Sequence, residues 1–255
     1  MIDTHCHLYS GEFKEDIETV VERAESAGVT SFYLPAIDSS THDAMIALET
    51  HFEGRCFSMI GLHPCSVKEN YRDELDIVKQ WLARKTFVAI GETGLDLYWD
   101  KTFENEQRLA LKEQIELALQ YDLPLILHTR EAMQQTIDVV KEYKGTGLRG
   151  IFHCFGGSLK EAEQIIETGF LLGIGGVVTY KNGGLDAVLP NIGTQHLVLE
   201  TDAPYLAPVP FRGKRNESGY LGYIAERIAL LTGMALEDVI ADTTKNATEL
   251  FSSKK

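Results

Sequence analysis

Side chains of the types that can bind divalent metal ions stand at or just past the ends of short apolar runs along this chain. The residues in question are His5, His7, Glu92, His128, His153 and Asp202. Imidazole nitrogens and carboxylate oxygens are the ligands that zinc and other first-row metals prefer in proteins. Their repeated placement after apolar runs predicts strands that aim these side chains at one mouth. A site of this kind favours metal-dependent hydrolysis.

Each of these residues also has an ordinary structural interpretation. His5 and His7 are two residues apart, so on a strand they share a face, but such pairs also occur as rim histidines. His128 or His153 alone could be a hydrogen-bonded core histidine. Glu92 could be a solvated loop carboxylate. Asp202 could cap a helix or a turn. The recurrence of the pattern, more than any one residue, favours a metal site.

Four histidines and two carboxylates exceed what a single tetrahedral ion uses. Two ions per chain, sharing Glu92 as a bridging ligand, account for the number of ligands, and zinc, manganese or magnesium are the ions considered. The expected spacing of such a pair is roughly 3.5–4 Å. Asp202 is then expected to bind metal and to take the proton from an attacking water molecule.

Other residues point to the substrate. Arg130 and a basic cluster that includes Arg215 favour a phosphate ester over an amide, since guanidinium groups bind phosphoryl oxygens well. A basic cluster in a loop is also compatible with a solvated surface. His63 precedes a proline and is read as a turn residue, a supporting group or a substrate contact. Glu200 shares the face of Asp202 and is expected to support it or to hold the basic loop.

The elements that must position these residues alternate along the chain. Apolar strand-like runs are followed by stretches with apolar residues at helical spacing. Three of the helical stretches end at Gly28, Gly145 and Gly169. The predicted strands cover 2–8, 31–37, 56–62, 87–92, 123–128, 149–154, 170–178 and 196–201. This alternation predicts an α/β fold: a single (β/α)8 TIM-like barrel over residues 1–255 with an extra C-terminal helix.

Composition narrows the class of protein. The formal net charge of −14 argues against a protein that coats nucleic acid non-specifically. Bound cations would reverse the sign inside the site, so an enzyme that grips a few phosphates is not excluded. No apolar stretch is long enough for a membrane span, and Asp3 interrupts any signal-like start, so we expect a cytoplasmic protein without an obligate protein partner. Cys6 and Cys154 adjoin ligand histidines and are predicted to face away from the site.

Seven short motifs occur in a fixed order. They are DTHCHL, GLHP, GETGLD, LHTREA, FHCFGGS, ETDAPYLAP and RGKRN. With this order and spacing the chain resembles the TatD family of metal-dependent deoxyribonucleases from residue 2 to about residue 250. One departure is Ser218, which stands where the resemblance leads us to expect proline.

The resemblance implies a TIM-like barrel that cleaves DNA, often from the 3′ end and with magnesium in assays. It implies His5, His7, Glu92 and Asp202 around one metal, and Glu92, His128 and His153 around the other. It also implies that His63, Arg130, Arg215 and Glu200 contact substrate or support the ligands.

The leading hypothesis is a metal-dependent deoxyribonuclease, most simply a 3′-to-5′ exonuclease. The alternative is a small-molecule amidohydrolase or phosphoesterase on the same barrel. Glu92 standing where a metal-bridging lysine is otherwise expected, together with the basic loop, favours the nuclease. A binding protein with a degenerate site conflicts with the intact ligand set.

Overall fold

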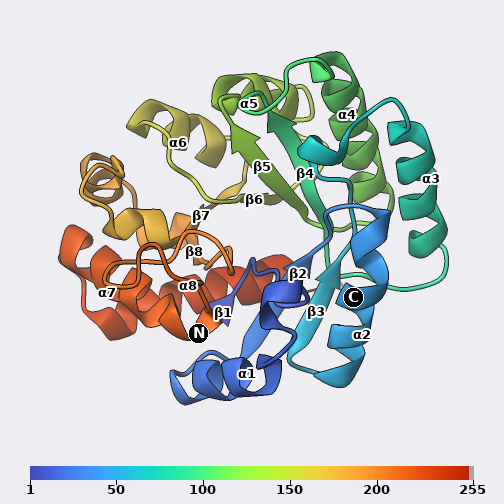
Figure 1. Ribbon diagram of the computed structural model, residues 1–255. Helices are drawn as coiled ribbons and strands as arrows, with labels where there is room; N and C mark the ends of the chain where they lie inside the picture. Colours follow the sequence, from blue (N-terminus) through green and yellow to red (C-terminus); the bar gives the residue numbers. More distant parts are fainter. Residues whose placement is uncertain (253–255) are drawn as a thin grey trace.

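Eight parallel strands form a ring in the computed structural model, which describes residues 1–252, and helices surround this ring (Figure 1). The strands are β1 (Ile2–Asp3), β2 (Ser31–Pro35), β3 (Cys56–Met59), β4 (Ile90–Asp96), β5 (Leu125–Arg130), β6 (Gly150–Phe152), β7 (Leu171–Ile174) and β8 (Leu197–Leu199). The helices are α1 (Ile17–Ser26), α2 (Ser39–His51), α3 (Tyr71–Leu82), α4 (Glu104–Gln120), α5 (Met133–Lys141), α6 (Leu159–Ile166), α7 (Leu221–Thr232) and α8 (Leu236–Phe251).

The ring is closed by pairings between two sheets. One sheet has the order β1-β2-β3 and the other has the order β4-β5-β6-β7-β8. Parallel bridges join Ile60 to Ile90 and Cys6 to Ala203, and the Thr4 amide donates to the Leu199 carbonyl at 3.0 Å. Both sheet edges are thereby paired, so the predicted (β/α)8 barrel is confirmed.

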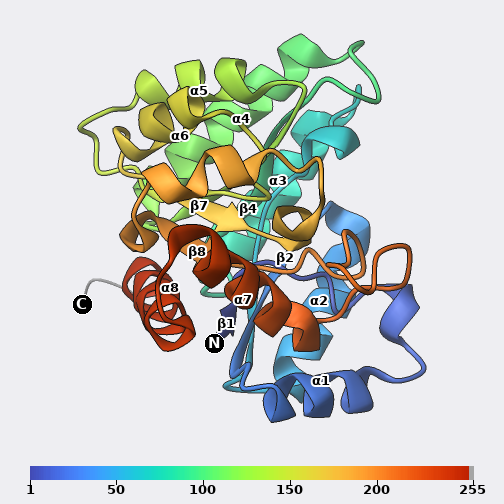
Figure 2. The same cartoon turned by 90° about the vertical axis from the view of Figure 1, so that its left-hand side faces the viewer.

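Inward-facing apolar side chains fill the amino-terminal end of the barrel. This layer takes one buried residue from or beside seven of the strands: Ile2, Tyr33, Met59, Ala89, Ile126, Ile151 and Val198. Ala247 and Leu250 of α8 belong to the same cluster, and the Phe251 ring stacks on Tyr33 with 3.9 Å between centroids. Figure 2 shows α8 beside α7 and β8. The extra C-terminal helix therefore covers this end, which leaves the opposite end for chemistry.

The helix ends follow the sequence signals. Gly28 and Gly169 adopt positive φ, 85° and 86°, just past the ends of α1 and α6, and Gly145 adopts φ 85° in the turns after α5. Ser158 begins α6 with a capping box, in which its side chain accepts from the Glu161 amide while the Glu161 carboxylate accepts from Ser158.

Among residues 1–252, every helix lacks the length or the apolar character that crossing a membrane requires.

Several strands differ from the prediction in their bounds. β1 ends at Asp3 and β3 at Met59, short of the predicted 8 and 62, so His5 and His7 lie beyond the strand that was expected to carry them. β4 runs from Ile90 to Asp96, later than the predicted 87–92, because Gly94 packs its bare backbone against the His128 carbonyl of β5. β7 ends at Ile174, short of the predicted 178, and a 3-10 turn follows. A Cβ on Gly176 would lie 2.0 Å from the Leu206 carbonyl oxygen, so the loop after β8 crosses where the strand was expected to continue.

Candidate metal centre

The barrel strands deliver the predicted ligands to one mouth. Ile126 and Ile151 point into the apolar layer, and side chains alternate along a strand, so His128 and His153 two residues later point the same way. Glu92 lies within β4, and Asp202 follows β8. All of these positions are at the carboxyl end of the strands, where barrel enzymes carry their active sites.

Glu92 lies between two groups of imidazoles. Its Oε2 is 3.1 Å from His5 Nε2 and 3.7 Å from His7 Nε2. Its Oε1 is 2.8 Å from His128 Nδ1 and 3.7 Å from His153 Nε2. Each carboxylate oxygen thus faces a different group of ring nitrogens, which is the geometry that a bridging ligand needs.

Asp202 completes the cluster on the side of β1 and β6. Its Oδ1 lies 3.7 Å from His5 Nε2, 3.5 Å from His7 Nε2 and 3.9 Å from His153 Nε2. All six predicted ligands are therefore brought together.

The ligand atoms fit a cation better than they fit one another. His5 is fully buried; its Nδ1 has no hydrogen-bond partner within residues 1–252, and its Nε2 faces the carboxylates of Glu92 and Asp202. Its ring stacks on His153 with 3.5 Å between centroids, which leaves Nε2 turned toward the carboxylates. Buried polar atoms are normally satisfied, and a divalent ion between these nitrogens and oxygens would satisfy them.

Burial and mutual charge set the ionisation of the cluster. Burial alone would raise the pKa of Glu92 and of Asp202, but the surrounding histidines hold both below their usual values. Burial lowers the pKa of His5, and His153 lowers it further, so His5 offers a neutral nitrogen. Burial would lower the pKa of His153, yet Glu200 and Glu92 raise it to about 10, so this imidazole must release a proton when it binds a metal ion. Anionic oxygens and imidazole nitrogens are the forms that bind metal.

Two carboxylates and a phenol orient the ligand histidines from behind. Glu200 Oε1 is 3.0 Å from His153 Nδ1. Glu200 was expected to support Asp202 or to hold the basic loop, and the residue it supports is His153. Asp96 Oδ2 is 3.0 Å from His128 Nε2. The Tyr9 hydroxyl is 3.0 Å from His7 Nδ1 and donates to the Pro35 carbonyl. Sequence reasoning missed Tyr9, because β1 ends at Asp3 and strand alternation does not extend to this residue.

The predicted substrate contacts divide into two groups. His63 Nε2 lies 3.5 Å from Glu92 Oε1, and both His63 and Arg130 line the cavity above the ligands. The structure does not bring Arg215 to this cavity, because Asp16 holds its guanidinium through two hydrogen bonds of 2.8 and 2.7 Å. The Glu12 carbonyl accepts a third bond from it.

The cavity over the ligands has a volume of about 690 Å³, within the usual range for small-molecule sites.

Cys6 faces away from the metal site as predicted, with its thiol directed at the Tyr33 carbonyl. The prediction for Cys154 is wrong, since this residue lines the cavity. β6 ends at Phe152, and Cys154 has φ +48°, so strand alternation no longer applies there.

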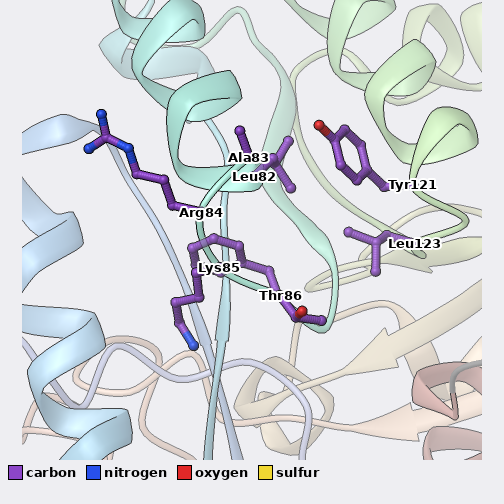
Figure 3. Close-up of a pocket in the computed structure, with 8 residues that line it drawn as sticks. Leu82, Ala83, Arg84, Lys85, Thr86, Tyr121 and Leu123 are labelled. Atoms are coloured by element: carbon purple, nitrogen blue, oxygen red, sulfur yellow. The ribbon is translucent and has the colours of Figure 1, made fainter.

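A second hollow of about 350 Å³ lies near the amino ends of β4 and β5 (Figure 3). Its lining residues are Leu82, Ala83, Arg84, Lys85, Thr86, Phe87, Tyr121 and Leu123. This lining offers neither an imidazole nor a carboxylate, so the metal-ligand chemistry belongs to the opposite mouth.

Comparisons with known proteins agree with this geometry. A family profile described as TatD related DNase matches residues 2–252. The Bacillus subtilis metal-dependent hydrolase YabD is 37% identical over 252 residues, covering 98% of each chain. A 3′-5′ ssDNA/RNA exonuclease TatD of Erwinia amylovora is 31% identical, covering 98% of this chain and 99% of the relative.

Solved structures give the same result for the fold. The crystal structure of YJJV, a TatD homologue from Escherichia coli, superposes with a TM-score of 0.92 at 30% identity, covering 98% of this chain and 97% of the other. An Escherichia coli phosphotriesterase homology protein, complexed with phosphate in its active site, has a TM-score of 0.72 at 13% identity, with 98% of each chain covered. The latter likeness concerns the fold alone.

Proposed function

This chain belongs to the family of TatD-related DNases and is a hydrolase. From that premise we propose that it is a metal-dependent 3′-to-5′ exonuclease that degrades DNA from the 3′ end. The observation that carries the proposal is the position of Glu92 between two groups of imidazoles. Relatives of similar length that carry the name 3′-5′ ssDNA/RNA exonuclease support the substrate class.

We propose two divalent ions per chain, with magnesium, manganese or zinc as the ions to test. His5, His7, Glu92 and Asp202 would hold one, and Glu92, His128 and His153 would hold the other. Bound ions of this kind polarise a phosphoryl oxygen and make a water molecule acidic enough to attack at neutral pH. Glu200, Asp96 and Tyr9 keep three of the imidazoles in place.

The protein's own groups then handle the proton and the charge. Asp202 is the base that accepts the proton of the attacking water at its carboxylate, because its neighbours keep it ionised and its side chain reaches the cavity. Arg130 binds a nonbridging phosphate oxygen of the substrate. His63 faces the same cavity from the side of β3 and contacts the phosphate or holds Glu92.

The test is hydrolysis of single-stranded oligonucleotides by metal-stripped protein, with each ion added back in turn. Strands labelled at the 5′ end should give a ladder that shortens one nucleotide at a time, whereas 3′-labelled strands should release labelled mononucleotide at once. Glu92→Ala should abolish turnover and lower the bound metal. Full activity in Glu92→Ala, or cleavage without metal, would contradict the proposal.

The same assay separates the alternative. Stoichiometric metal with no cleavage of DNA or RNA, but with hydrolysis of small phosphoesters or amides, would assign the site to a small-molecule hydrolase. The single domain over residues 1–255 and the cytoplasmic location stay predictions from the sequence, and residues 253–255 lie outside the described part of the chain.

A further inference from the structure

Two exposed aromatic side chains stand at the mouth of the metal cavity and take no part in the proposed reaction. Trp99 is 70% exposed and Tyr205 is 51% exposed, and both line the cavity. Large aromatic rings usually supply buried area, so exposed rings beside a reactive centre point to a ligand that covers them.

Trp99 is tied to the metal centre through one carboxylate. Asp96 Oδ1 accepts hydrogen bonds from the amides of Tyr98 at 3.0 Å and Trp99 at 3.4 Å. The other oxygen of Asp96 contacts His128. The indole is therefore carried on a short segment after β4 whose position is fixed relative to the proposed ligands.

A cation lies beside these rings. The Arg130 guanidinium carbon is 4.0 Å from the centroid of the Tyr98 ring and 5.1 Å from that of Trp99. Within the described part of the chain, no carboxylate forms a salt bridge with Arg130, and cation–π contacts leave its N–H donors available. An aromatic face and a phosphate-binding group thus stand side by side.

The second ring faces the cavity from the loop after β8. The Tyr205 amide donates to the Asp202 carbonyl at 2.8 Å, and the Tyr205 ring centroid lies 6.1 Å from that of His7. The metal centre is therefore flanked by an aromatic ring on the β4 side and another on the β8 side.

We propose that Trp99 and Tyr205 stack on unpaired bases at the end of the substrate and so make the site selective for single-stranded nucleic acid. Unpaired bases offer open π-faces to aromatic side chains, whatever their sequence, whereas paired bases in a duplex are already stacked on their neighbours. This inference rests on the proposed nuclease function and assigns its single-strand selectivity to named residues.

Binding can be tested apart from cleavage. The chain has two tryptophans, so Trp81→Phe leaves Trp99 as the only indole. A phosphorothioate single strand, which resists hydrolysis, should quench its fluorescence. An otherwise identical strand without bases at its 3′-terminal nucleotides should bind with the same phosphate contacts but quench far less.

Substitutions give the second arm. Trp99→Ala should weaken binding of the intact strand by about 10- to 100-fold, raise KM more than it lowers kcat, and leave the abasic strand unaffected. Trp99→Phe should retain most of the affinity. Tyr121→Ala is the matched control, since Tyr121 is an exposed aromatic at the other end of the barrel.

Equal quenching by intact and abasic strands, or unchanged affinity in Trp99→Ala, would overturn the stacking proposal. Hydrolysis of bis(4-nitrophenyl) phosphate and of the unmodified strand is followed in parallel. If the wild type cleaves the strand and Trp99→Ala matches it on every substrate, the stacking proposal is wrong and the nuclease proposal stands. If quenching depends on the bases but the wild type does not cleave the strand, the nuclease proposal is wrong and the stacking site stands.

Discussion

The ligand residues of this site are few in type, and their roles depend on what stands behind them. Glu200 is buried and contacts His153 Nδ1, so it fixes the ring that turns Nε2 toward the cavity. Groups of this kind set the orientation and basicity of a ligand histidine.

Replacing Glu200 by glutamine keeps the shape of the side chain and removes its charge. We expect Glu200→Gln to lower metal affinity by about 10- to 100-fold, because His153 loses the carboxylate that orients and polarises it. Competition with a chelating dye measures the affinity, and circular dichroism checks the fold. Glu217→Gln is the control, since Glu217 is also buried but pairs with Arg23. Equal losses in both variants would contradict the assigned role.

At this scale the sequence predicted the ligands and missed the supporting contacts. His128 lies within β5 and His153 directly follows β6, so strand alternation alone predicted that both point inward. Tyr9, Trp99 and the exposure of the Cys154 side chain depend on turns after the strand ends, where that periodicity no longer holds. Arg215 was predicted from charge, but its partner Asp16 is about two hundred residues away in sequence and meets it only in the fold.

Among the strands, β7 has a packing role that its glycines reveal. A Cβ on Gly173 would lie 2.1 Å from Glu200 Oε2, whereas a Cβ on Gly175 would find only ordinary contacts, the nearest at 3.7 Å. The bare face of Gly173 therefore makes room for the carboxylate that supports His153.

This contrast gives a matched pair of variants. Gly173→Ala should displace the flexible end of Glu200 and lower metal affinity about 10-fold or more while the barrel stays folded. Gly175→Ala should bind metal as the wild type does. Calorimetric metal titration of both proteins decides the matter, and wild-type affinity in Gly173→Ala would show that Glu200 does not hold its position through this contact.

The order of strands and helices was predictable because each repeats a simple apolar pattern that ends in a recognisable signal. The bounds of β4 and β7 were not, since they depend on Gly94 meeting the His128 carbonyl and Gly176 meeting Leu206. Such contacts join residues from different strands and loops, so the sequence of a single apolar run does not predict them.

Over the whole molecule, one end of the barrel is a packed apolar layer and the other carries the candidate metal site. Ala247 and Leu250 of α8 belong to the apolar layer at the amino end, while titratable groups gather at the carboxyl end. The barrel and its additional helix followed from counting alternating runs, but the position of α8 over one end required the fold.

Stability should depend on pH through a histidine outside the metal centre. Burial lowers the pKa of His42, and the nearby Glu74 and Asp38 only partly offset this. The unfolded chain then binds a proton near pH 6.5 that the folded chain resists. The stabilising contribution of neutral His42 is thus present above about pH 6.5 and is lost as the pH falls below it.

Urea unfolding of metal-free protein at pH 7.5 and pH 5.5 tests this. His42→Gln should lose less free energy of unfolding on acidification than the wild type. His51→Gln, at the exposed end of the same helix, is the control that removes an imidazole and leaves His42 in place. An identical loss in all three proteins would exclude His42 as a source of the pH dependence.

The most direct test of the central claim is a titration of metal-stripped protein with manganese, in which bound metal and hydrolysis of a single-stranded oligonucleotide are measured on the same samples. Six converging ligands with Glu92 between them predict that activity rises with bound metal and saturates at two ions per chain. Glu92→Ala should bind less metal and stay inactive throughout. Hydrolysis that does not follow bound metal, or that survives in Glu92→Ala, would contradict the account.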